Sequence, residues 1–325
     1  MKDHGNKAAK KKTTPIKWQL PMKRVLIALV PIVVSSVYFF GWRALLMVAV
    51  CNLAAFLTEY AFARVYKEPV TSAAFVTGTL FAMAMPPPLP IWMAVVGVVV
   101  GIMFGKMVFG GFGKNVFNPA LTGRAFIYVS FGAQMTGTWS EPYGGVFGGL
   151  GGYLPDAITG ATPGMLLGQP GTDISIWRLV LGHTAGTLGG TSAILALLGG
   201  LYLVRTKAAN YRIPLAGFAG YFAAQTAAWL ALGGVGAGNP LRSVFAGNIV
   251  FGLFFYATDP VSAPKTDEAR WLYGAFIGAM SSVITVFAAW PAGTMFSILL
   301  ANMFAPITDH GIRAWKKKRK AGGKT

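Results

Sequence analysis

The sequence predicts an all-α integral membrane protein of about ten transmembrane helices, arranged as two inverted five-helix repeats with broken helices. Three observations predict this fold: the composition, a series of apolar segments and an internal repeat. The 325 residues are 54% hydrophobic and only 12% charged, with a mean hydropathy of +0.55, whereas a soluble domain is about 25% charged. This composition argues against a soluble enzyme, and the single cysteine argues against a disulfide-stabilised secreted domain.

A helix that spans a bilayer needs about 20 predominantly apolar residues. Ten segments approach this requirement, although glycine and proline shorten or interrupt several of them: 24–41, 43–63, 71–86, 90–110, 116–132, 177–204, 213–232, 241–258, 271–289 and 291–308. They divide the chain into five parts, namely a basic tail (1–23), a first five-helix repeat (24–132), a long connection (133–176), a second repeat (177–308) and a basic tail (309–325).

Two pairs of segments indicate an internal repeat. Residues 68–88 resemble residues 239–260, and the stretch around Asn118 resembles the stretch around Asn302. Five predicted helices separate the copies, and because five is odd, the second copy crosses the membrane in the opposite direction, as in inverted-repeat transporters. The alternative is that any two membrane helices rich in Gly, Pro and Phe look alike.

Binding sites in inverted-repeat folds lie where helices break. Proline interrupts the chain here at 85–88, at Asn118-Pro119 and at 258–260. We expect the triple proline to form a loop at the membrane edge. Asn118-Pro119 is predicted to lie deeper, which makes it a candidate for a site.

The net charge of +18 is concentrated at the two ends of the chain, with eight Lys/Arg in the first 24 residues and seven after position 312. Basic segments beside membrane helices face the cytoplasm and anionic lipid, so we expect both termini to be cytoplasmic and expect no nucleic-acid binding. The predicted inner connections carry further basic residues: Arg64, Lys67, Lys106, Lys114, Arg205, Lys207, Arg212, Lys265 and Arg270. Residues 133–176 contain no Lys or Arg and are predicted to face outside.

The sequence has no Walker loop, no HExxH and no paired CxxC, and we predict neither a resident metal nor a catalytic side chain. Charged residues within membrane segments are candidates for function because their burial is costly. Glu59 and Asp259 are therefore candidates for an ion pathway, and Arg124 for contact with a carboxylate or an anionic cofactor. The alternatives are that Asp259 caps the next turn and that Glu59 pairs with Arg64.

The long connection contains Thr159-Gly160-Ala161-Thr162, followed by Pro163. Glycine and alanine leave the backbone accessible beside a threonine hydroxyl, so a modifying enzyme could approach and the hydroxyl could attack a phosphorus atom. Taken alone, four residues are a weak signal, and an ordinary Thr-Pro turn is the alternative.

These residues resemble the RnfD/NqrB family, the large membrane subunits of the Rnf and Na+-translocating NADH:quinone reductase complexes. The family's flavin-attachment motif is (Ser/Thr)-Gly-Ala-Thr, which Thr159–Thr162 matches. The family patterns around 113–120 (GKNVFNPA) and 257–263 (ATDPVSA) are matched as well. The resemblance covers residues 20–312 in the right order.

The resemblance implies that FMN is joined through its phosphate to Thr162 by a separate flavin transferase that uses FAD, and that this flavin lies on the outer side. Thr162 is then an anchor, with Thr159, Gly160 and Ala161 beside it. It also implies a second flavin, riboflavin, held noncovalently within the bundle. We expect riboflavin near Asn118-Pro119 and Asp259, and we expect Arg124 to contact a cofactor.

The resemblance further implies a subunit of an ion-translocating oxidoreductase in the cytoplasmic (inner) membrane of a bacterium or archaeon, inactive without its partner subunits. Length favours the Rnf branch over the NqrB branch. Two other interpretations stay open, a non-redox channel or transporter with inverted repeats and a structural scaffold. The sequence leaves the coupling ion, Na+ or H+, undetermined.

Overall fold

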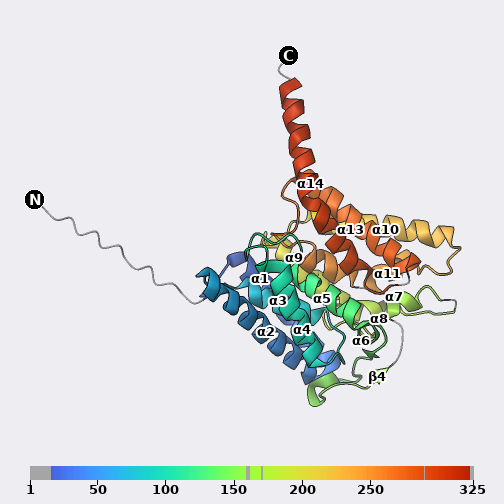
Figure 1. The fold of residues 1–325 in the computed structure, drawn as a ribbon. Coiled ribbons are helices and arrows are strands. Elements are labelled where there is room, and N and C mark those ends of the chain that lie inside the picture. Colours follow the sequence, from blue (N-terminus) through green and yellow to red (C-terminus); the bar gives the residue numbers. More distant parts are fainter. Residues whose placement is uncertain (1–15, 159–161, 170, 247, 289, 323–325) are drawn as a thin grey trace, which may run out of the picture.

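The computed structural model describes residues 16–158, 162–169, 171–246, 248–288 and 290–322. They form a predominantly helical bundle, which confirms the helical class (Figure 1). Two short sheets accompany the helices: β1 (Ile16–Lys17) pairs in parallel with β2 (Val70–Thr71), and β3 (Trp139–Ser140) pairs antiparallel with β4 (Ala157–Ile158).

The first half of the chain contains five main helices, and the last but one continues into a π-helical turn: α1 (Leu20–Phe40), α2 (Trp42–Tyr66), α3 (Ala73–Met83), α4 (Ile91–Ile102) with η1 (Met103–Met107), and α5 (Pro119–Ser130). The connection that follows has only short helices: α6 (Gly132–Thr136), η2 (Gly148–Gly151) and α7 (Pro163–Leu166). Each predicted segment of the first repeat therefore has its helix.

The second half is more interrupted: α8 (Ile176–Leu181), α9 (Ala193–Arg205), α10 (Arg212–Ala231), α11 (Pro240–Ala246), α12 (Ile249–Phe251) with the π-helical η3 (Gly252–Tyr256), α13 (Asp267–Phe287) and α14 (Gly293–Gly322). The predicted single helix over 177–204 is wrong, because α8 ends at Gly182 in a left-handed conformation and α9 begins only at Ala193. The basic tail after 308 continues α14, which projects from the bundle in Figure 1.

Within the described residues, α1, α2 and α13 are long and apolar enough to cross a membrane, and α3, α4 with η1, and α9 are shorter apolar helices. The structure thus supports a membrane protein, while the full count of ten spanning helices stays a prediction. Glycine and proline explain the short elements, because each disfavours a continuous helix.

Glycines allow close helix contacts in both halves. A Cβ added at Gly278 in α13 would lie 1.9 Å from the carbonyl oxygen of Gly217 in α10. Likewise, a Cβ at Gly123 in α5 would lie 2.3 Å from the carbonyl oxygen of Gly97 in α4. Small residues let membrane helices approach closely and gain van der Waals contact, so these two crossings hold α5 and α13 in place beside the site described below.

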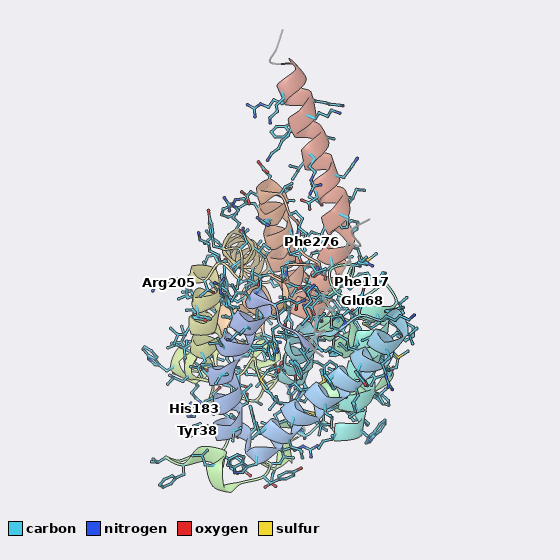
Figure 2. The ribbon with its side chains drawn as sticks, turned by 90° about the vertical axis from the view of Figure 1, so that its left-hand side faces the viewer. Tyr38, Glu68, Phe117, His183, Arg205 and Phe276 are labelled. Atoms are coloured by element: carbon cyan, nitrogen blue, oxygen red, sulfur yellow. The ribbon has the colours of Figure 1, made fainter. Side chains whose placement is uncertain are left out.

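Connections predicted to lie on one side of a membrane gather at one end of the bundle. Figure 2 shows Tyr38 and His183 at one end, and Glu68, Phe117 and Arg205 towards the end from which α14 projects. His183 packs edge-on against Phe39, with 5.4 Å between ring centroids.

Candidate functional site

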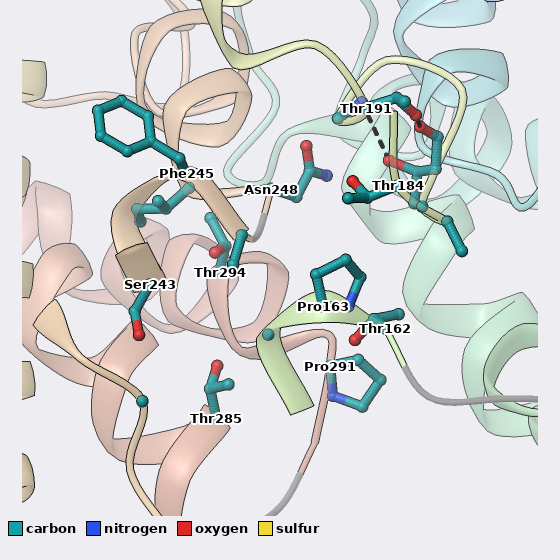
Figure 3. A pocket seen from close by; sticks show the side chains of 18 of the residues that line it. Thr162, Pro163, Thr184, Thr191, Ser243, Phe245, Asn248, Thr285, Pro291 and Thr294 are labelled. Atoms are coloured by element: carbon teal, nitrogen blue, oxygen red, sulfur yellow. Dashed lines mark hydrogen bonds between the residues drawn. The ribbon is translucent and has the colours of Figure 1, made fainter. Parts of the chain in front are cut away.

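The larger cavity of the described structure has a volume of about 230 Å³ and lies between the two halves of the chain. A volume of this size holds on the order of 15 water molecules, so the cavity is far larger than a packing defect. Its walls come from α5, α7, the segment 184–191, α10, α11, α13 and α14. Figure 3 shows Thr162 and Pro163 among the side chains that border it.

Thr162 is the N-cap residue of α7 and has extended backbone angles (φ −67°, ψ 156°). Its carbonyl oxygen accepts a hydrogen bond from the N–H of Leu166, 3.0 Å away, but its side chain makes no capping bond. The backbone of Thr162 is thus fixed by the helix while its hydroxyl borders the cavity. Thr159, Gly160 and Ala161 lie outside the described residues, so the rest of the predicted motif has no structural account.

Arg124 lines the same cavity from the middle of α5. The residue is only 5% exposed, and its Nε has no hydrogen-bond partner. None of the five ion pairs found between described residues includes it. The structure therefore brings together Arg124 and Thr162, two residues that sequence reasoning selected separately.

Two further polar groups of this cavity lack partners, and sequence reasoning missed both. They are the hydroxyl of Tyr128, one helical turn after Arg124 on the same face of α5, and Oδ1 of Asn248, between α11 and α12. The four-residue spacing from Arg124 could have suggested Tyr128. No local sequence signal marks Asn248, because its position depends on how the second half folds back.

Other polar groups in the same wall are bonded within the protein. The Gln225 amide donates from Nε2 to the Gly238 carbonyl, 2.9 Å away, and accepts at Oε1 from Ser282 Oγ at 2.8 Å. The Tyr221 hydroxyl donates to the carbonyl oxygen of Ser243 at 3.3 Å. Buried polar groups are usually paired in this way, so the cavity wall contains both paired and unpaired polar side chains.

A second cavity of about 50 Å³ borders the N-terminus of α5 and both π-helical turns. Its lining includes Asn118, Pro119 and Asp259, the three residues expected near riboflavin. It also includes Lys106 of η1 and Phe255 of η3. π-Helical turns are rare in proteins, and those that occur are often at functional sites. The presence of two of them at this cavity therefore supports it as a candidate binding site.

The protein already uses the side chains of Asn118 and Asp259. Asn118 Oδ1 accepts from the N–H of Ala120 at 3.0 Å and caps α5, while its Nδ2 donates to the Tyr256 carbonyl at 3.3 Å. Asp259 Oδ2 accepts from the N–H and the hydroxyl of Ser262, at 3.2 and 2.8 Å. The capping alternative for Asp259 is thus seen in the structure, and its contact with a ligand or ion stays a prediction.

Glu59 is paired with Lys106, and the alternative pairing with Arg64 is wrong. Lys106 Nζ lies 2.5 Å from Glu59 Oε2, and both side chains are buried. Thr71 completes the cluster, because its N–H and hydroxyl donate to Glu59 Oε1 at 2.8 and 2.6 Å. Arg64 instead lies over the ring of Tyr60. Lys106 was expected in an inner connection, but it lies within the helix and serves as an internal counter-ion.

The bundle and its cavities define a helical membrane protein with an internal polar site between two halves of the chain. This chain belongs to the NQR2, RnfD, RnfE family, whose model matches residues 11–318. The membership confirms the resemblance found in the sequence, and the family together with the apolar helices indicates a bacterial membrane protein.

Relatives from both branches of the family are similar to this chain. It is 38% identical over 302 residues to the B subunit of the Na(+)-translocating NADH-quinone reductase of Pseudomonas aeruginosa, and the match covers 86% of this chain and 71% of that protein. It is 36% identical over 301 residues to the D subunit of the proton-translocating ferredoxin:NAD(+) oxidoreductase complex of Clostridium ljungdahlii, covering 89% and 88% respectively. Both relatives are subunits of ion-translocating oxidoreductases, as the sequence predicts for this chain.

Proposed function

We propose that this chain is the flavin-carrying membrane subunit of an Rnf-type ion-translocating electron-transport complex, with FMN joined through its phosphate to Thr162. One observation carries the proposal: Thr162 borders a cavity that is also lined by Arg124, a buried residue whose Nε has no hydrogen-bond partner. A channel for neutral solutes needs neither group. An anchored anionic cofactor uses both.

The attachment step follows from the chemistry of the hydroxyl. Thr162 Oγ forms a bond to the FMN phosphorus of FAD, the pyrophosphate bond of FAD breaks, AMP leaves, and the hydroxyl proton is lost to solvent or to the transferase. A separate flavin transferase performs this step. In the mature protein Thr162 acts as an anchor and takes no part as an acid or base.

A bound flavin accepts and donates electrons, while the protein sets its position and electrostatic surroundings. Cavity-lining residues of this chain supply those surroundings. We place riboflavin at the smaller cavity, bordered by Asn118 and Asp259. The helix α5 contributes to both cavities, because Asn118 and Arg124 are six residues apart, about 9 Å along the helix axis.

For the ion pathway we propose Glu59 and Asp259, at the end of the molecule that holds the smaller cavity. Lys106 already neutralises Glu59, so a transported Na+ or proton has to compete with an internal cation. The second carboxylate, that of Asp259, lines the same cavity as Lys106. Coupling between electron transfer and ion movement would then depend on whether Lys106 pairs with Glu59 or with Asp259.

We also propose the membrane arrangement that the charges predict, with both termini cytoplasmic, residues 133–176 outside and the halves related as inverted repeats. The contact between Asn118 and Asn302, two positions matched in the internal repeat, supports this arrangement. The Rnf branch is favoured because the match covers 88% of the Clostridium relative and 71% of the Pseudomonas relative. The second candidate, an NqrB-type subunit, is favoured by the slightly higher identity of 38%.

The experiment that tests the anchor is a denaturing gel of protein co-expressed with a flavin transferase. We expect ultraviolet fluorescence on the band of the parent and of Thr162→Ser, which keeps a hydroxyl, and none for the isosteric Thr162→Val. Thr159→Val is the matched control and should stay fluorescent. A parent band without fluorescence, despite a transferase that is active on another substrate, would refute the proposal.

A further inference from the structure

Arg124, Tyr128 and Asn248 form an unpaired polar set on one cavity. The polar atoms without a partner are Nε of Arg124, the hydroxyl of Tyr128 and Oδ1 of Asn248. All three residues line the cavity that Thr162 borders. Gln225 and Tyr221, in the same wall, have their bonds within the protein.

The flavin-free cavity is energetically unfavourable around Arg124. A buried charge without a counter-charge is strongly destabilising, and unpaired buried hydroxyls and amides add to the cost. None of the ion pairs between described residues includes Arg124, so an acceptor group of a ligand in this cavity would find an available donor. Because the protein supplies a cation, that ligand carries negative charge or gains it.

The chemistry of the three groups specifies the ligand further. Arg124 and Tyr128 are hydrogen-bond donors that lie one turn apart on α5, and Asn248 offers an acceptor from the other half of the chain. The polar edge of a flavin ring presents carbonyl oxygens and ring nitrogens as acceptors on both sides of a single N–H donor. Two donors and one acceptor match that edge.

We propose that Arg124, Tyr128 and Asn248 bind the polar edge of the flavin ring, and that Arg124 raises the reduction potential of the flavin. The proposal rests on the proposed attachment at Thr162. A positive charge at this edge stabilises the negative charge that the ring gains on reduction. The phosphate is the other anionic part of the cofactor, but the ring edge uses the donor of Tyr128 and the acceptor of Asn248 as well as the charge of Arg124.

The first test compares thermal stability of flavin-free and flavin-loaded protein, purified in the same detergent after expression without or with the transferase. Arg124→Met should raise the melting temperature of the flavin-free protein, because it removes an unpaired buried charge, and should reduce the stabilisation that loading provides. Tyr128→Phe should leave the flavin-free protein unchanged and also reduce the gain from loading. Tyr221→Phe, which loses an internal hydrogen bond, should lower the melting temperatures of the flavin-free and the flavin-loaded protein equally.

The second test is a redox titration of the loaded protein followed by flavin absorbance. We expect the midpoint potential of Arg124→Met to fall by about 59 mV or more, which corresponds to a tenfold change in the equilibrium constant for one electron. Arg124→Lys should recover part of the shift. Arg43→Met is the charge control, because Arg43 donates to the carbonyls of Pro87 and Leu89 and does not line this cavity.

The outcomes separate the two proposals. A parent without covalent flavin refutes the attachment at Thr162. A parent that fluoresces normally, with an unchanged potential and an unchanged gain from loading in Arg124→Met and Tyr128→Phe, refutes only the assignment of the polar edge. A fall in stability of the flavin-free Arg124→Met protein would also overturn it, because Arg124 would then be paired within the protein.

Discussion

The backbone N–H of Asn118 donates a hydrogen bond to Oδ1 of Asn302, 3.2 Å away. This bond joins the N-terminus of α5 to α14, and both residues are buried. Nδ2 of Asn302 donates in turn to the Tyr273 hydroxyl at 2.7 Å. A single amide side chain therefore ties three helices together beside the smaller cavity.

We expect Asn302→Ala to destabilise the protein by about 1–3 kcal/mol, because it leaves a buried backbone N–H and a buried phenol without partners. The measurement is thermal or denaturant unfolding of the purified protein in detergent. Met303→Ala is the control, since Met303 is the next residue of α14 and is 56% exposed. Equal stability of the two variants would show that the Asn302 bonds contribute nothing.

The positions at which the chain breaks were largely predictable from sequence, because proline and glycine act locally. The Asn118-Pro119 motif does begin a helix, α5, with Asn118 as its cap. The sequence predicts a continuous helix through 182–192 because the segments on both sides of this glycine-rich interruption are apolar. Local composition alone does not reveal whether such a stretch continues a helix.

The ion pair between Glu59 and Lys106 provides a second prediction. Glu59→Gln leaves Lys106 charged, buried and unpaired, and should destabilise the protein by about 3–5 kcal/mol. The double variant Glu59→Gln/Lys106→Met removes both charges and should recover most of that loss. Unfolding of the four proteins of this double-mutant cycle measures the coupling.

Glu68→Gln is the matched control, because Glu68 is exposed at the same end of the bundle. It should change stability by less than about 0.5 kcal/mol. A double variant that is as unstable as the sum of its single variants would contradict the internal counter-ion role of Lys106.

This pair also marks where sequence reasoning stops. The sequence makes Glu59 a candidate because an acidic residue within a membrane segment is costly, but Lys106 is 47 residues further along and is predicted to lie in a connection. The pairing depends on the packing of α2 against the π-helical turn of α4, which is a tertiary contact. In the same way, the sequence indicated Thr162 and Arg124 separately, and only the fold places them at one cavity with Asn248.

A third prediction concerns pH. Asp309 accepts hydrogen bonds from the N–H groups of Lys265 and Thr266, at 2.7 and 2.8 Å, at the N-terminus of α13 and beyond the last predicted membrane segment. Burial alone raises the pKa of the Asp309 carboxyl, but these bonds and the Arg313 charge outweigh it, so the pKa lies below its ordinary value.

A lowered pKa in the folded state means that the ionised carboxylate stabilises the fold above the unfolded pKa of about 3.9. That contribution is lost as the pH falls through the folded value. Asp309→Asn should therefore lower the melting temperature at pH 7, and the difference from the parent should shrink below about pH 3.9. A difference that stays constant down to the most acidic pH tested would contradict this linkage.

The close approach of α10 and α13 yields the last prediction. Gly278→Ala places a methyl group 1.9 Å from the carbonyl oxygen of Gly217, a distance that forces the helices apart. Overpacking of this kind costs about 1–3 kcal/mol of stability, and it should increase the separation of α10 and α13, which form part of the cavity wall.

Gly311→Ala in α14 is the control, because nothing lies within 4 Å of an added Cβ there. It should be neutral or stabilising by about 0.5–1 kcal/mol, since alanine favours a helix over glycine. Unfolding in detergent compares the two variants, and equal stability would mean that α10 and α13 are not held together by their glycines.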